Sequence, residues 1–161
     1  MLSHKLILDD DEEDYQLLAI HSSLEEFKMA YLLNKHLEIN MRRSRLDLDF
    51  NHGSVLANYP LYIFKEPVKY RNYYLIKNKY KGPLKKVLSS GSLFNEDEGT
   101  PQLTYLIPEF KEVDFFLKVE EDIEPEQLQK LINRIAFIPN VITIYAVDAN
   151  QLKSKNNLIL E

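Results

Sequence analysis

The sequence contains no cysteine, and only four of its 161 residues are glycine. Without cysteine the chain has no disulfide, no thiolate zinc site and no cysteine nucleophile, which agrees with a reducing compartment. The four glycines are too dispersed to form a Gly-rich phosphate-binding loop of the Walker or dinucleotide type. The four histidines lack the close helical spacing of zinc hydrolases. We therefore expect no metal, no cofactor and no catalytic activity.

Long apolar runs are also lacking. A membrane-spanning helix needs roughly 20 apolar residues. Uncharged stretches such as 135–147 are shorter, and that stretch contains Pro139 and Asn140. The first residues show no pattern of a signal peptide. From these absences we expect a cytoplasmic protein without a membrane segment.

The composition is that of one globular domain. Hydrophobic residues make up 45% of the chain and charged residues 28%, with a formal net charge of −5. A length of 161 residues suits one hydrophobic core rather than two. We expect a single domain over 1–161, with a solvated acidic segment at 9–14, a flexible loop at 89–101 and a C-terminal tail at 149–161.

The hydrophobic periodicity predicts strands interrupted by two helices. Period-two or β-branched patterns predict strands at 15–21, 46–50, 59–65, 70–80, 113–120 and 141–147, with the last one in the interior of a sheet. Overlapping capping boxes at 22–26 and Pro125 mark the starts of the two helices. This order favours an α+β two-layer sandwich: a largely antiparallel sheet with two helices on one face, built from ferredoxin-like or ACT-like elements.

The first helix carries a broad apolar arc. At 100° per residue its members are Leu24, Phe27, Ala30, Tyr31, Leu33 and Leu37. Asn34 falls inside this arc. Because a buried amide needs hydrogen-bond partners, Asn34 is either a clamp to a neighbouring loop, which we favour, or part of a binding site.

The stretch 107–120 is the most structured part of the sequence. Pro108 disfavours helix at Ile107, and the alternation that begins at Val113 predicts a second strand after a turn. Phe116 interrupts the polar row of that strand. We therefore expect its second face to be partly covered.

The residues Ile107-Pro108-Glu109, followed after three positions by Val113-Asp114-Phe115, resemble the signature of the IPExxxVDY family of small bacterial proteins. The last position is Phe115 here rather than Tyr. Further stretches that resemble the family are 20–25, 33–35, 47–50, 138–142 and 152–155. The resemblance covers most of the chain, is weakest between about 55 and 103, and implies a bacterial cytoplasmic protein with no assigned activity.

Three carboxylates lie close together in the signature stretch. Glu109, Glu112 and Asp114 have the chemistry for an acid and base pair or for a hard cation. The alternative that we favour is structural, with Glu109 binding backbone amides and the other two facing water. Glu109 and Asp114 are candidate binding residues if they converge on one concave surface.

The span 65–86 is strongly basic and rich in tyrosine. Lys77 and Lys79 are its central candidate binding residues, and alternation places them on the face of Tyr73 and Leu75, opposite Tyr74. Basic strands with exposed aromatic rings are typical of single-stranded RNA readers. The alternative is a sheet edge guarded by lysines, neutralised by an acidic partner or by the chain's own acids. We favour this alternative and expect weak RNA binding at most.

These observations favour a non-catalytic interaction or regulatory module with a protein partner. An ACT-like small-ligand sensor is the second hypothesis, and a weak single-stranded RNA binder is the third. Nucleic acid is an unlikely partner for a chain of this charge.

Overall fold

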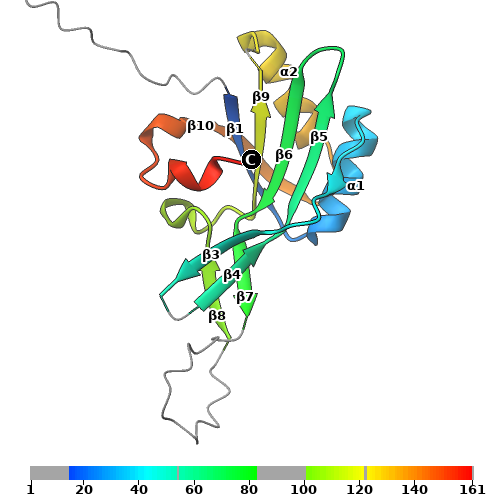
Figure 1. Ribbon diagram of the computed structural model, residues 1–161. Helices are drawn as coiled ribbons and strands as arrows, with labels where there is room; N and C mark the ends of the chain where they lie inside the picture. The colour runs from blue at the N-terminus through cyan, green and yellow to red at the C-terminus, as the bar shows by residue number, and fades with distance from the viewer. Residues whose placement is uncertain (1–14, 54, 83–100, 122, 161) are drawn as a thin grey trace, which may run out of the picture.

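A six-stranded antiparallel sheet forms the centre of the protein (Figure 1). The computed structural model describes residues 15–53, 55–82, 101–121 and 123–160. The acidic segment 9–14, Lys85, Lys86 and nearly all of the predicted loop 89–101 lie outside these ranges. The strands of the sheet are β1 (Tyr15–Ser22), β2 (Arg42–Arg43), β5 (Leu61–Glu66), β6 (Arg71–Lys77), β9 (Phe115–Glu120) and β10 (Val141–Val147), in the spatial order β10-β1-β9-β6-β5-β2.

Two helices, α1 (Glu26–Leu37) and α2 (Pro125–Ala136), cover one face of this sheet. Met29, Leu33 and Leu37 of α1 are buried against the sheet, as is Ile135 of α2. α2 packs into the same core through an apolar stripe whose residues recur every three or four positions, namely Leu128, Leu131, Ile132 and Ile135. The predicted α+β architecture, with two helices on one face of a largely antiparallel sheet, is confirmed.

The chain order builds two interleaved split βαβ units. β1 pairs antiparallel with both β9 and β10, so β9 and β10 run parallel and α2 connects them. In the same way β9 pairs antiparallel with both β1 and β6, and the connection from β1 to β6 contains α1. The order β10-β1-β9-β6 is that of a ferredoxin-like unit. β5 and β2 extend it at one edge.

Smaller elements cover the second face of the sheet. They are β3 (Leu48–His52), β4 (Val55–Tyr59), β7 (Lys79–Gly82), β8 (Gln102–Tyr105) and the 3-10 turns η1 (Pro108–Phe110), η2 (Ala149–Gln151) and η3 (Lys155–Leu158). Together with the sheet they enclose a second core, in which Tyr59 and Phe116 are fully buried. The C-terminal tail docks here through Leu152 and Leu158.

Lys118 is a buried cation on this second face, with 5% of its surface exposed. Its ammonium donates to the carbonyl oxygen of Leu158 at 2.9 Å and lies 3.1 Å from a carboxylate oxygen of Glu120. It also lies 4.5 Å from the centroid of the Tyr15 ring. A buried charge is tolerated only when it is paired and hydrogen-bonded. Lys118 therefore ties the docked tail to the centre of the sheet.

Asn78 follows β6 directly and is fully buried. Its side-chain amide donates to the carbonyl oxygens of Phe110 and Val113, both at 2.9 Å, and its side-chain oxygen accepts from the amide of Ile107 at 2.8 Å. Its own backbone amide donates to Asp114 O and its carbonyl accepts from Leu106 N, again at 2.9 Å. Asn78 thus forms five hydrogen bonds with the segment 106–114, which contains most of the signature-like residues.

Two predictions about α1 are wrong. The helix begins at Glu26 with Glu25 as its N-cap residue and has no side-chain capping bond. The hydroxyl of Ser22 instead accepts from Leu24 N and donates to the carbonyl of Asn140. Phe27 and Tyr31 lie outside the buried face and are 57% and 64% exposed. The buried face is centred on Met29, Ala30, Leu33 and Leu37, so Met29 packs on the sheet in place of the two aromatic residues.

One prediction about the sheet is also wrong. β10 is an edge strand and not an interior one, although its β-branched composition is typical of the interior. The basic stretch 65–86 is divided between an interior strand, β6, which lies between β5 and β9, and β7, which carries Lys79 and Lys81 and, among the described strands, pairs with β8 only. Composition reports how apolar a strand is, whereas its place in the sheet depends on pairings with segments far away in the chain.

We expect Asn78→Leu, which keeps the branched shape and the number of heavy atoms of the side chain, to lower the free energy of unfolding by about 3 kcal/mol or more. The change removes three hydrogen bonds and leaves the carbonyl of Val113 and the amide of Ile107 without these partners, at about 1–3 kcal/mol each, whereas the carbonyl of Phe110 still accepts from Val113 N. Urea unfolding followed by circular dichroism measures the loss. The exposed Asn133→Leu is the matched control and should change stability by less than about 0.5 kcal/mol. A loss below 1 kcal/mol for Asn78→Leu would contradict this role.

Candidate functional site

Asn34 forms the clamp that the sequence favours. Its side-chain oxygen accepts from Met41 N at 2.7 Å and its amide donates to Met41 O at 3.1 Å. These two bonds fix the loop between α1 and β2. The polar groups of Asn34 are satisfied within the chain, so Asn34 serves the fold.

Glu109 and Asp114 lie in different surroundings. Glu109 accepts from the amide of Ser154 at 3.1 Å and from its hydroxyl at 2.6 Å, and so holds the C-terminal tail. Asp114 accepts from the amide of Ser22 at 2.8 Å and from the ammonium of Lys79, also at 2.8 Å. The two carboxylates line separate hollows and do not share a partner. They do not form an acid and base pair.

The two candidate lysines are paired with the chain's own acids. The ammonium of Lys77 lies 3.0 Å from a carboxylate oxygen of Glu26 in α1, and Lys79 is paired with Asp114. Burial alone would raise the pKa of Glu26, but hydrogen bonds from its own backbone amide and from Lys77 outweigh that effect, and the pKa is lowered. Tyr73 and Tyr74 beside them are each only 4% exposed. These rings cannot stack on nucleic-acid bases without unfolding part of the core.

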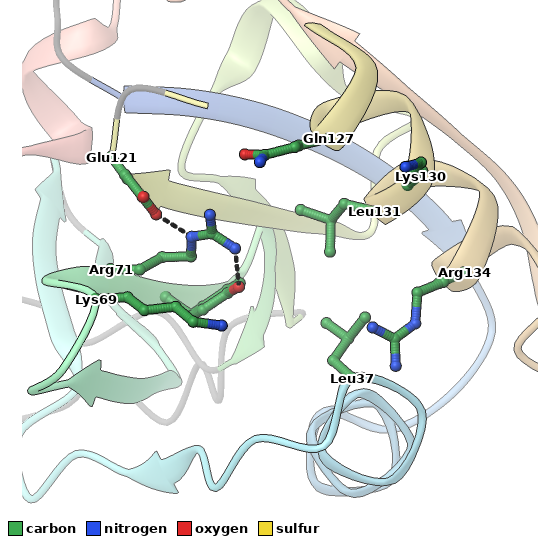
Figure 2. A pocket seen from close by; sticks show the side chains of 9 residues that line it. Leu37, Lys69, Arg71, Glu121, Gln127, Lys130, Leu131 and Arg134 are labelled. Atoms are coloured by element: carbon green, nitrogen blue, oxygen red, sulfur yellow. Dashed lines mark hydrogen bonds and ion pairs between the residues drawn. The ribbon is translucent and has the colours of Figure 1, made fainter. Parts of the chain in front are cut away.

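A different set of side chains surrounds a hollow of about 400 Å³ between the start of β6 and the two helices. Figure 2 shows Lys69 and Arg71 on one side, Gln127, Lys130 and Arg134 of α2 on the other, and the apolar Leu131 and Leu37 between them. The remaining lining residues are Tyr73 and Glu121. We call this feature the basic hollow.

The charges around the basic hollow are unbalanced. Four of its lining side chains are positive (Lys69, Arg71, Lys130 and Arg134) and one, Glu121, is negative. A concave surface lined by charge of one sign concentrates oppositely charged ligands. The hollow therefore favours an anion.

Arg71 is held by two neighbouring side chains of the hollow. Its side chain is 20% exposed, its Nε donates to a carboxylate oxygen of Glu121, and its Nη1 donates to the hydroxyl of Tyr73 at 3.4 Å. The hydrogen bond to Glu121 raises the pKa of the guanidinium above its usual range. A guanidinium has five N–H donors, so donors remain for a bidentate contact with a carboxylate or phosphate.

The turn beside the hollow holds an unusual tyrosine. Tyr70 lies between Lys69 and Arg71, is 85% exposed, and has a backbone φ of 55°. Bulky residues rarely adopt this left-handed conformation, which costs roughly 1–2 kcal/mol. Such backbone strain is found most often at functional sites. Tyr70 stands between two lining residues in the chain but is not itself part of the lining.

Sequence reasoning missed the basic hollow for a definite reason. Lys69 and Arg71 fall within the basic span 65–86, whereas Lys130 and Arg134 lie in the second helix, opposite its apolar residues. Some sixty residues separate the two pairs in the chain. Only the packing of α2 beside β6 brings them around one concavity.

Two further findings concern the described residues. No three His, Cys, Asp or Glu side chains among them gather closely enough to hold a metal ion. Neither described helix has the length and apolar character that crossing a membrane requires. No family model, curated protein or solved structure matches this chain. The resemblance to the IPExxxVDY family therefore stays a prediction.

The contact between Glu109 and Ser154 predicts a pH dependence of tail docking. Burial is the largest single effect and opposes ionisation of Glu109, but the hydrogen bonds from the hydroxyl and amide of Ser154, together with those from the amides of Glu109 and Lys153, outweigh it and lower the pKa of the carboxyl from its ordinary value of 4.5. Because the pKa is lowered in the docked state, the contribution to docking is complete above the ordinary value of the undocked carboxyl. It is lost as the pH falls through the lowered pKa.

We expect the amide resonance of Ser154 in ¹⁵N-labelled protein to titrate with a midpoint below pH 4.5. In Glu109→Gln the amide side chain carries no charge, and the titration of Ser154 should disappear. Glu112→Gln, in the same turn, is the matched control and should leave the titration unchanged. A Ser154 resonance that titrates equally in Glu109→Gln would contradict the assignment.

Proposed function

We propose that the protein is a non-catalytic regulatory or interaction module that binds a carboxylate- or phosphate-bearing small molecule in the basic hollow. The observation that carries this proposal is the convergence of Lys69, Arg71, Lys130 and Arg134 on one concave surface. A hollow of about 400 Å³ falls within the usual range for small-ligand sites, roughly 300–1,000 Å³.

The floor of the hollow adds a requirement on the ligand. Leu37 and Leu131 contribute apolar surface, and Tyr73 also belongs to the lining. An acidic group contacting Arg71 therefore leaves room for an apolar portion over the two leucines. The expected ligand class is a small organic acid or phosphate ester with an apolar part, rather than an inorganic ion.

The surroundings of the candidate catalytic groups support a binding role rather than a reaction. Asp114 is occupied by the amide of Ser22 and by Lys79, and Glu109 is occupied by Ser154. Both carboxylates thus have a structural use within the chain, and each keeps lone pairs beyond the hydrogen bonds that it accepts. The carboxylate in the basic hollow, Glu121, is engaged with Arg71 in the same way.

Among the three hypotheses drawn from the sequence, the small-ligand sensor gains the most support as the specific form of the module. The RNA hypothesis is less well supported, because Tyr73 and Tyr74 are buried and cannot stack on bases. Lys77 and Lys79 form ion pairs within the chain and are therefore less available to phosphates. A bacterial cytoplasmic setting and a protein partner that reads the bound state remain part of the proposal.

The test is a thermal-shift screen of the purified chain against amino acids, organic acids, nucleotides and sugar phosphates. At a ligand concentration about 100 times Kd, binding stabilises the folded state by about 2.7 kcal/mol. For a domain of this size, that raises Tm by roughly 5–10 °C.

Two variants locate the binding site. Arg71→Lys keeps the charge but loses the planar fork, and Lys130→Glu reverses one charge on the exposed face of α2; each should weaken binding about tenfold or more. Lys28→Glu makes the same charge reversal on an exposed position of α1 and should leave binding unchanged. If no acid in the screen raises Tm, or if Lys130→Glu binds as tightly as wild type, the proposal is wrong.

A further inference from the structure

The outer side of β10 is an unpaired sheet edge. β10 ends the six-stranded order and pairs with β1 on its inner side only. Among the described residues, no backbone hydrogen bond joins 142–147 to any segment other than β1. Because alternate residues of a strand direct their N–H and C=O groups to opposite sides, every second residue presents an open donor and acceptor.

This edge lacks most of the features that keep sheet edges from pairing. Natural edges are short, charged, interrupted by proline, or bent by a bulge. β10 has seven residues, none of which is charged or proline. One bulge lies at its start, where the register with β1 shifts between His21 and Ser22, and it leaves 143–147 regular.

The opposite edge of the same sheet shows the contrast. β2 has only two residues, Arg42 and Arg43, and both are exposed and positively charged. A short, charged strand of this kind is typical of a sheet edge that does not pair with another strand. The difference within one sheet indicates that β10 has a pairing partner in the working protein.

The side chains of β10 favour an added strand. Ile144 packs on the helix side of the sheet, Tyr145 and Val147 pack on the other side, and Ala146 is exposed. A hollow of about 300 Å³ lies next to Tyr145 and Val147, closed by Phe110 and Leu152. Strand addition commonly combines open backbone groups with such a hollow for a side chain of the incoming strand.

We propose that the partner is a second copy of this chain, whose β10 pairs antiparallel with the first about a two-fold axis. Six strands from each copy then form one continuous sheet, with both pairs of helices on the same face. In a symmetric antiparallel pair, opposed residues lie on the same face, so one residue lies opposite its own copy and the axis passes midway between the two. The middle of the regular part is Tyr145.

This register suits the side chains. Thr143 lies opposite Val147 of the second copy, and the bulky Ile144 lies opposite the small Ala146. β-branched cross-strand pairs stabilise a sheet, and no like charges meet because the regular part carries none. A different protein would need a matching neutral strand, whereas the second copy supplies one by symmetry.

The pairing has an expected strength and salt dependence. Five residue pairs form a small interface, so we expect a Kd in roughly the micromolar range. Each copy carries a formal net charge of −5, and added salt screens the repulsion between copies. Association should therefore strengthen between about 20 and 200 mM salt.

Sedimentation velocity of the full chain from about 1 to 200 µM measures the association. Wild type should shift from monomer to dimer over this range. Ala146→Lys places an ammonium on the exposed edge and should weaken dimerisation at least tenfold. Val68→Lys, at an 83% exposed position in the turn between β5 and β6, is the matched control and should dimerise like wild type.

Cysteine cross-linking tests the register, because the wild-type chain has no cysteine. Thr143→Cys combined with Val147→Cys places a thiol opposite a thiol across the axis. Oxidation should give a covalent dimer on a non-reducing gel. Each single variant leaves its two thiols about 13 Å apart, four residues along the strand, and should not cross-link efficiently.

A dimer lost in Ala146→Lys, kept in Val68→Lys and cross-linked only in the double cysteine variant supports the proposal. A wild type that is monomeric at 200 µM overturns it and leaves β10 to a strand of another protein. A dimer that survives Ala146→Lys, or that does not cross-link in the double variant, overturns the two-fold pairing.

Discussion

The side chain of Asn78 satisfies three backbone groups of the segment 106–114, and its main chain satisfies two more. Backbone groups buried without partners would destabilise the fold, so this segment can cross the sheet's second face only because Asn78 meets it there. Through this contact the signature stretch reaches the tail, since Glu109 binds Ser154 and the carbonyl of Leu106 accepts from the side chain of Asn157. One buried amide thus positions the segments that close the second core.

The two faces of the sheet are stabilised by different kinds of interaction. The helix face is an apolar core in which Leu33, Ile135 and Leu117 pack without polar contacts of their side chains. The second face combines apolar burial with satisfied polar groups, namely Asn78, Lys118 and the hydroxyl of Tyr59. Directional bonds specify a unique arrangement of irregular segments, whereas apolar packing is sufficient for regular helices.

The basic hollow and the open edge of β10 lie at different places in the fold. The hollow forms where α2 passes the start of β6; Arg71, Lys130 and Arg134 come from these two elements, which pack into the helix-face core, and Lys69 comes from the turn before β6. The edge exists because β10 closes the sheet without a further strand. α2 lines the hollow and also connects β9 to β10, so a ligand that bound as proposed would contact the element that leads into the edge strand. This connection gives a physical route by which binding could influence association.

The sequence by itself determined the elements whose burial pattern is local: the strand at 15–21, the apolar stripe of the second helix, and the α+β class that follows from their order. The structure bears these out because a periodicity of two or 3.6 residues directly reports which side of an element is buried. The clamp at Asn34 was also within reach, since an amide in an apolar arc needs partners. Only the tertiary structure decided that the apolar strand 141–147 lies at an edge, that Phe27 and Tyr31 face outward, and that Asn78 organises the signature stretch. It also decided that Lys69, Arg71, Lys130 and Arg134 meet. These outcomes depend on contacts between residues distant in the chain, for which a single sequence carries no local signal.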